Sequence, residues 1–326
     1  MDFIIDEKNS GKSMLVFLKN IIGISASTVS HLKQIPYGIC VNGNHVTVRY
    51  TLRAGDIVTV KTEDTDDMVN EHIFPKELDV KIIYEDDHII VVNKPINMPT
   101  HPSHNHYNDT LGNAMAYVYS QRNVPFVFRP AGRLDKNTSG LVILSKTRAA
   151  ASFYFNEAKN GKIQKHYVAV LDGEIKADQD TVYSIDSSIK RMGDSIIKRT
   201  IAPKDDPDAS RAQTLWKLIY SGNGISIVDA YPITGRTHQI RVHFSSIGHP
   251  LVGDALYGDG KYGFDCHLLH AITLQTRECF SDIPLKLYAE PNHIMKEFVK
   301  QTTHKELSSI IDNYSFFEDL SQSKEK

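Results

Sequence analysis

The apolar positions of the first sixty residues change from helical to strand spacing. Apolar side chains recur at helical intervals over 14–22, and a serine-rich segment begins a second short helix over 25–35. A strand then runs into the turn Asn42-Gly43, which is typical of a hairpin, and a last strand covers 57–60. Two helices followed by a hairpin predict a small α/β domain over residues 1–62.

Residues 79–300 carry mostly strand patterns and few long helical ones. The run 141–144 is continuously apolar, which is typical of a strand buried on both faces. The apolar runs and alternating segments together predict strands over 80–83, 89–92, 141–144, 165–170, 214–220, 224–230 and 268–274. Helical spacing predicts helices over 111–118, 149–158 and 240–247, the first of them capped by Asn108 or Asp109. We expect only weak hairpins in the polar segment 172–211.

Two polar segments bound this larger domain. Residues 63–78 are acidic and aperiodic, which predicts a linker. Residues 301–326 are polar and charged with one apolar patch over 310–317, which predicts a partly ordered tail. Charge is segregated: 37 Lys and Arg against 39 Asp and Glu give a net charge of −2, yet basic residues outnumber acidic ones over 11–62. This local excess suits contacts with phosphate groups. The alternative is a protein-contact domain whose lysines are merely solvated.

Composition excludes several classes of protein. No apolar run reaches the ~18 residues of a membrane span, and the acidic N-terminus does not resemble a secretory signal. The three cysteines are scattered, which argues against a disulfide framework and a cysteine zinc site and predicts a reducing cytoplasm. Three histidines over 100–106 suggest a metal site, but they have no acidic or cysteine partner at ligand spacing. An irregular loop is therefore expected there.

The stretch from Arg133 to Leu144 combines a charged pair, a tight turn and a strand that is expected to be buried. Asp135 follows Arg133 by two residues, and small polar side chains and Gly140 then form a tight turn before the apolar run. A carboxylate on such a turn is held rigidly beside a buried strand, as functional groups often are. The alternative is a turn aspartate that bonds only its own backbone.

Several motifs occur in an order that resembles the RluA/RluC/RluD-type family of RNA pseudouridine synthases. They are the lead-in Ile83 to Pro95, Arg133-Leu-Asp135-x-x-Thr138-Ser139-Gly140, Lys165-x-Tyr167, Gly235-Arg-Thr-His-Gln-Ile-Arg241-x-His243, the loop that ends in Gly253-Asp254, and Leu269-His270-Ala271. The first domain is similar to the ribosomal-protein-S-four-like RNA-binding domain. The resemblance covers nearly all of the chain except the tail. It implies an α+β fold, with a mixed, mainly antiparallel central sheet and flanking helices around a catalytic cleft.

The resemblance also assigns residues to the reaction. It implies that Asp135 is the catalytic carboxylate, that Arg241 is its partner and that Tyr167 packs on the base near the departing proton. A close guanidinium lowers the pKa of a carboxylate and fixes its geometry. We expect the remaining site residues to contact RNA, namely Arg133, Lys165, Arg236, His238, Lys33 and Arg53. The family's common pattern has a histidine before Arg-Leu-Asp, whereas this chain has Gly132, which leaves a contact of that histidine in doubt.

The expected activity is conversion of uridine to pseudouridine in structured RNA, most of all in large-subunit ribosomal RNA. Transfer RNA is the main rival substrate. A non-catalytic RNA-binding factor for ribosome assembly is the alternative without chemistry. A nucleoside hydrolase or glycosidase is disfavoured, because such enzymes usually pair two carboxylates across the bond. We expect a cytoplasmic monomer that needs neither cofactor nor metal and does not bind membranes.

Overall fold

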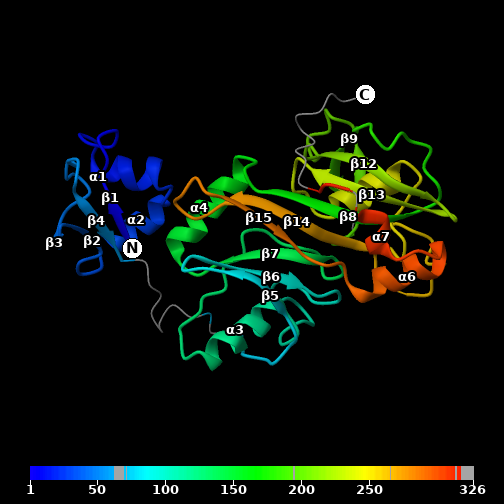
Figure 1. The fold of residues 1–326 in the computed structure, drawn as a ribbon, viewed down its shortest axis with the longest axis horizontal. Coiled ribbons are helices and arrows are strands. Elements are labelled where there is room, and N and C mark those ends of the chain that lie inside the picture. Colours follow the sequence, from blue (N-terminus) through cyan, green and yellow to red (C-terminus); the bar gives the residue numbers. More distant parts are fainter. Residues whose placement is uncertain (62–69, 71, 194, 265, 313, 317–326) are drawn as a thin grey trace.

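The first domain of the computed structural model is a small sheet with helices on its surface, and it lies to one side of the larger domain (Figure 1). The structure describes residues 1–61, 70, 72–193, 195–264, 266–312 and 314–316. Its four strands, in spatial order, are β1 (Asp2–Ile4), β4 (Ile57–Val60), β2 (Ile39–Val41) and β3 (Asn44–His45). The helical segments are α1 (Met14–Val16), the π-helical η1 (Phe17–Ile21) and α2 (Ala26–Leu32).

These elements follow the predicted order of two helical segments and a hairpin. The Ser25 hydroxyl accepts a hydrogen bond from the Thr28 amide at 3.1 Å, so Ser25 is the N-cap of α2. The strand β1 was not predicted, because three residues are too few to show a period. Half of the predicted acidic linker, 63–78, lies outside the described residues.

The larger domain is built on one mixed sheet, in which almost all neighbours are antiparallel. Only β7 and β14 pair in parallel among the strands the structure describes. This confirms the predicted α+β fold. In spatial order the strands are β5 (Lys81–Glu85), β6 (Ile89–Lys94), β7 (Ser139–Ser145), β14 (Leu269–Arg277), β8 (Gln164–Asp172), β13 (Ile225–Pro232), β12 (Gln213–Gly222) and β9 (Tyr183–Asp186), while β15 (Pro284–Tyr288) also pairs with β14.

Helices cover both faces of the β6–β7 half. Alternate side chains of a strand point to opposite faces, so Ile90 and Val142 face one helix while Ile89 and Leu141 face another. The helices are α3 (Leu111–Gln121) and α4 (Arg148–Lys159) respectively. Burial of β7 along its whole length confirms the predicted two-sided strand. The N-cap of α3 is Thr110 rather than Asn108 or Asp109, because the capping box needs Asn113 three residues later.

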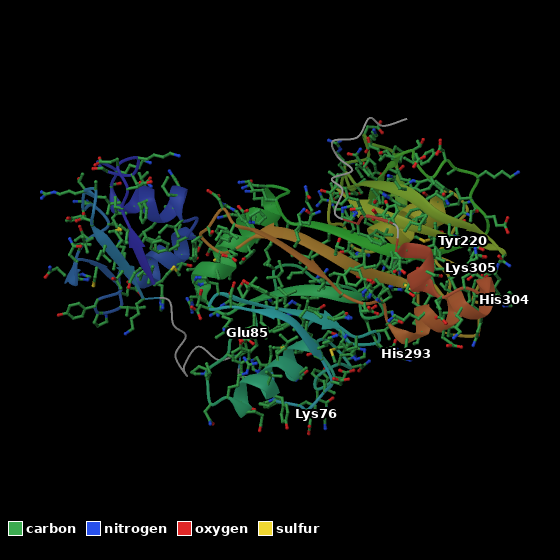
Figure 2. The ribbon with its side chains drawn as sticks, viewed as in Figure 1. Lys76, Glu85, Tyr220, His293, His304 and Lys305 are labelled. Carbon is green, nitrogen blue, oxygen red and sulfur yellow. The ribbon has the colours of Figure 1, made fainter. Side chains whose placement is uncertain are left out.

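The other half of the sheet is covered by α5 (Gln239–Ser246) on one face and by α6 (His293–Thr303) and α7 (Leu307–Ile311) on the other. Tyr220 of β12 lies beside Lys305, which precedes α7 (Figure 2). Leu307, Ile311 and Phe316 are buried against the sheet. The segment predicted as a partly ordered tail thus packs on the sheet through these three apolar side chains, while 317–326 lie outside the described residues.

Two further features complete the fold. The hairpin of β10 (Ser188–Arg191) and β11 (Arg199–Ala202) is separate from the main sheet and accounts for part of the predicted weak hairpins. The first domain contacts the larger one through the edge-to-face rings of Phe3 and Phe280, whose centroids are 5.6 Å apart. Over the described residues, no helix is long and apolar enough to cross a membrane.

Candidate active site

The turn that carries Asp135 is held by polar contacts on both sides. A cavity lined by the start of α5 lies beside this turn, and Tyr167 packs against both halves of the sheet there. Asp135 lies at this cavity with its side chain about one third exposed. The contacts that hold the turn are Thr138 Oγ1 to His267 Nε2 at 2.8 Å, Ser139 Oγ to His270 Nδ1 at 2.8 Å, Thr100 Oγ1 to the Leu134 carbonyl at 2.9 Å and Lys94 Nζ to the Lys136 carbonyl at 3.1 Å.

Lys94 is fully buried directly behind the turn. Its ammonium donates to the carbonyls of Pro95 at 2.9 Å and Met98 at 2.7 Å as well as to that of Lys136. Burial lowers the pKa of Lys94 to about 7, and the nearby Asp135 carboxylate opposes that shift. Lys94 thus ties the end of β6 to the backbone next to Asp135.

Arg241 lies between two carboxylates and binds one of them more tightly. Its Nε and Nη2 donate to the two oxygens of Asp254 at 2.7 and 2.8 Å, whereas its Nη1 is 3.5 Å from Asp135 Oδ2. Burial opposes the charge of Arg241, but the bonds to Asp254 raise its pKa overall. Burial would likewise raise the pKa of Asp254, yet the bonds from Arg241 hold it below its usual value. The pair therefore stays ionised and presents one remaining guanidinium edge to Asp135.

Tyr167 lines the same cavity from β8. The cavity has a volume of about 180 Å³ and is bounded mainly by the Asp135 turn, the segment 232–241 and Leu269. Burial raises the pKa of the Tyr167 hydroxyl, and the Asp135 carboxylate adds to the effect. Tyr167 is therefore a neutral phenol at neutral pH. The structure thus brings together the three residues predicted to be catalytic, which lie up to 106 positions apart in the sequence.

Three of the residues predicted to contact RNA also line this cavity. Arg133 and Arg236 are exposed at its rim, and the Arg236 Nε donates to the Arg211 carbonyl at 3.0 Å. His238 lies deeper, with its Nε2 3.8 Å from Asp135 Oδ2. Exposed guanidinium groups around a cavity are suited to phosphate groups.

The other three lie elsewhere. Lys165 donates to the Leu141 carbonyl at 3.1 Å, and burial lowers its pKa to about 8. Because its ammonium is directed at β7 and does not line the cavity, its position does not support the RNA contact predicted for it. Lys33 and Arg53 are exposed on the first domain, outside the cavity.

Gly132 has a backbone conformation that favours glycine. Its φ is +114°, and a Cβ built on it meets no atom within 4 Å. The position is thus restricted by backbone conformation and not by space. A histidine at this position would be strained in this backbone conformation.

Lys94, Asp254 and Tyr257 also belong to the site, although their sequence context predicted no role for them. Asp254 and Tyr257 lie in the loop after α5, where the pattern Gly253-Asp254 and Tyr257-Gly258 was the available signal. The histidine-rich loop forms a local pair instead of a metal site: His106 Nδ1 is 2.6 Å from Asp109, and its Nε2 is 3.4 Å from the Lys136 ammonium. No group of three or more potential metal ligands occurs in the part of the chain that the structure describes.

A model of the RNA pseudouridylate synthase family matches residues 88–246, which include every residue that lines this cavity except Leu269. The RNA pseudouridine synthase YjbO of Bacillus subtilis is 32% identical over 283 residues, which are 87% of this chain and 97% of that protein. Ribosomal large subunit pseudouridine synthase C of Vibrio cholerae is 29% identical over 87% of this chain and 91% of its own length. The mitochondrial tRNA pseudouridine(32) synthase of Saccharomyces cerevisiae is 31% identical over 68% of this chain but only 45% of its own length.

The fold also matches a solved structure. Human RNA pseudouridylate synthase domain containing 4 superposes with a TM-score of 0.54 at 22% identity, over 68% of this chain and 93% of that structure. At this identity the match supports the fold of the larger domain.

Proposed function

The chain belongs to the family of RNA pseudouridine synthases, and on this premise we propose that it isomerises a uridine of large-subunit ribosomal RNA with Asp135 as the catalytic carboxylate. The observation that carries the proposal is the position of Asp135. Its carboxylate is on a turn held from both sides, it lines a cavity together with Tyr167, and the Arg241 guanidinium is 3.5 Å away. The arrangement thus holds one carboxylate in a fixed position at the cavity, beside the neutral ring of Tyr167.

The reaction needs a carboxylate next to the sugar. The bond between ring nitrogen 1 and the anomeric carbon breaks, the base turns, and its carbon 5 then forms the new bond to the sugar. Asp135 either attacks the anomeric carbon or removes the 2′ proton, and both routes need the ionised carboxylate. Glycoside hydrolases use a carboxylate at the same electron-poor centre.

In the proposed mechanism, Arg241 stabilises the charge of Asp135, and Asp254 holds Arg241 in place. The bidentate pair fixes the guanidinium, so that its free edge stabilises the charge of Asp135 without a cost of reorganisation during the reaction. Asp254 acts through Arg241 and is thus a positioning residue.

Tyr167 and Arg133 contact the RNA in the proposal. Tyr167 packs on the extruded base as a neutral phenol, close to the proton that leaves carbon 5 after the new bond forms. Arg133, exposed at the rim, fills the place that the base leaves in the RNA. We expect Arg133→Ala to weaken binding of substrate RNA more than Asp135→Asn does, and equal binding by both variants in a filter assay would refute this role.

Ribosomal RNA is favoured over transfer RNA by the extent of similarity. The large-subunit enzyme of Vibrio cholerae matches along nearly its whole length, whereas the tRNA enzyme of Saccharomyces cerevisiae matches over less than half of its own. We also propose that the first domain is an S-four-like RNA-binding domain, which its order of elements and its exposed basic side chains support.

Pseudouridine mapping tests the function. Ribosomal and transfer RNA are mapped from cells that lack the gene and from the same cells complemented by wild type, Asp135→Asn or Asp259→Asn. We expect at least one site in large-subunit RNA to disappear without the gene, to return with wild type and to stay absent with Asp135→Asn. The exposed Asp259 carries the same chemical change outside the cavity, so Asp259→Asn should restore the site.

Other outcomes discriminate between the alternatives. Sites that disappear only from transfer RNA would replace the ribosomal substrate with the rival one. Identical maps in all strains would remove the enzymatic proposal and leave a binding function. Full activity of Asp135→Asn would remove the catalytic role of that carboxylate.

A further inference from the structure

Tyr257 contacts both of the side chains that flank Asp135. Its ring lies against the guanidinium of Arg241, whose carbon is 5.0 Å from the ring centroid. Its hydroxyl oxygen is 2.9 Å from Nδ1 of His238. The same oxygen accepts a hydrogen bond from the backbone amide of Arg199 at 2.9 Å. Tyr257 thus stands one contact behind Asp135 on two separate paths.

The donors and acceptors of this network can be assigned in one consistent way. A backbone amide only donates, so the Tyr257 oxygen accepts from Arg199 and keeps its own hydrogen free to donate. A carboxylate only accepts, so the ring nitrogen that faces Asp135, Nε2 of His238, is best occupied by a hydrogen. A neutral imidazole carries one hydrogen, so its Nδ1 is then the acceptor of the Tyr257 hydroxyl.

The neutral state of His238 is consistent with its surroundings. Burial lowers the pKa of His238; Asp135 and Asp254 oppose this shift, while Arg241 and Arg199 reinforce it. The ring therefore has one N–H to direct, and the partner of Nδ1 decides which nitrogen carries it.

The backbone conformation of His238 also indicates that its ring is held next to Asp135. His238 is the N-cap of α5, but its side chain makes no capping bond, and its backbone is left-handed, with φ 58°. Both features are unfavourable for a histidine at a helix start. They are accounted for if the ring is required at Asp135, since strained backbone persists where the surroundings need that geometry.

We propose that Tyr257 is a positioning residue that fixes His238 in the tautomer whose Nε2–H faces Asp135, and that it supports Arg241 with its ring. This inference rests on the proposed catalytic role of Asp135. His238 is then a donor to the carboxylate, in place of the direct RNA contact expected from sequence. The gap of 3.8 Å is longer than a hydrogen bond, and such contacts commonly tighten only when substrate is bound.

A double-mutant cycle tests the proposal. Tyr257→Phe removes the hydroxyl and keeps the ring against Arg241. Turnover is followed by the release of tritium from substrate RNA labelled at uridine carbon 5, using the RNA identified by mapping. We expect kcat to fall about tenfold with KM unchanged within about twofold, the effect of one lost hydrogen bond in the transition state. In a His238→Ala background, the same change should cause no further loss, because Tyr257 acts through His238.

The control is Tyr84→Phe, which removes a hydroxyl bonded to Asp86 at 2.9 Å outside the cavity. It should leave kcat and KM unchanged, and the unfolding midpoint of Tyr257→Phe should match that of this control. Equal losses from Tyr257→Phe with and without His238 would overturn the proposal, as would a loss confined to KM. Asp135→Asn is measured alongside. If it stays active, the proposed catalytic role of Asp135 fails. If it is inactive while Tyr257→Phe equals wild type, this inference alone fails.

Discussion

Arg241 is shared unequally between two carboxylates, and the inequality has a physical consequence. Asp254 takes two short hydrogen bonds and is nearly fully buried, while Asp135 is partly exposed and takes one long contact. A carboxylate that is paired too tightly would lose reactivity, because a strong ion pair stabilises its ground state. The tight bonds to Asp254 fix the cation, and the weak one leaves Asp135 available to the substrate.

Because Asp254 holds the buried Arg241 cation, removal of its charge should lower the free energy of unfolding. In Asp254→Asn, the Arg241 cation remains buried and loses its bidentate partner. We expect the free energy of unfolding to fall by about 3 kcal/mol, as for other buried pairs from which one partner is removed. Urea unfolding followed by circular dichroism measures it. Asp259→Asn, at an exposed carboxylate, should change stability by less than ~0.5 kcal/mol; equal effects of the two variants would contradict the argument.

A buried histidine in contact with the end of the Asp135 turn predicts a loss of stability in acid. Burial lowers the pKa of His270 to about 4, whereas the unfolded value is near 6.5. As pH falls, the unfolded chain binds the proton first, so the contribution of His270 is complete above about pH 6.5 and is lost between 6.5 and 4. From pH 6.5 to 5 the loss should be about 2 kcal/mol for this residue, at ~1.4 kcal/mol per pH unit.

Urea unfolding at a series of pH values measures this loss. His270→Gln should be less stable at pH 7, because the contacts with Ser139 and the Ala289 carbonyl are disturbed, but its stability should depend less on pH. The exposed His293 offers the matched change, and His293→Gln should keep the slope of wild type. An unchanged slope in His270→Gln would show that other groups cause the acid sensitivity.

At the scale of elements, the parallel contact between β7 and β14 begins directly after the turn that carries Asp135. Gly140 pairs with Ala271, and its φ is +113°. A Cβ on Gly140 would lie 2.3 Å from the carbonyl oxygen of Ala271, a distance at which backbone must move. The two strands can therefore approach at this point only through a glycine.

Two alanine substitutions separate steric contact from backbone strain. Gly132 has almost the same φ, but a Cβ there meets nothing within 4 Å. We expect Gly132→Ala to cost about 1–2 kcal/mol of unfolding free energy from strain alone. Gly140→Ala carries the same strain and an overpacking cost of about 1–3 kcal/mol in addition. Thermal or urea unfolding of both variants measures the difference, and similar losses would argue against close approach as the reason for Gly140.

The elements also show where the sequence is informative. Long apolar runs such as 141–144 and the spacing of the two helices over 14–35 predicted their elements, because period and burial act locally. The short strands β1 and β15 and the packing of α7 were not predicted, since their burial depends on surfaces formed by distant residues. The same holds in the site. Motif order pointed to Asp135, Tyr167 and Arg241 as candidates, but the tight bond of Arg241 to Asp254 and the contacts of Tyr257 exist only after folding.

At the scale of the whole molecule, the first domain is attached to the catalytic one by a small apolar contact. Phe280 meets the ring of Phe3 at 5.6 Å and that of Phe153 in α4 at 5.2 Å, and Asn156 donates to the Gly23 carbonyl at 3.1 Å. The core of the first domain lies around Met14, Leu18 and Val58 and includes only Ala149 among the buried residues of the larger domain. Surface side chains of the first domain can therefore be substituted without disturbing the cavity. Mutations should then be able to change RNA binding without changing catalysis.

Charge reversal on the first domain tests this separation. Lys33→Glu and Arg53→Glu change exposed side chains outside the cavity. If they contact phosphate groups, each variant should raise KM for substrate RNA and reduce the slope of log affinity against log salt by about one. The value of kcat at saturating RNA should stay that of wild type, because the cavity is unchanged.

Lys176→Glu, at an exposed lysine of the larger domain, gives the matched change of charge and should have a smaller effect on the salt slope. Equal slopes for all three variants would mean that the basic side chains of the first domain act only through net charge, and a fall in kcat would mean that the domain takes part in positioning the uridine.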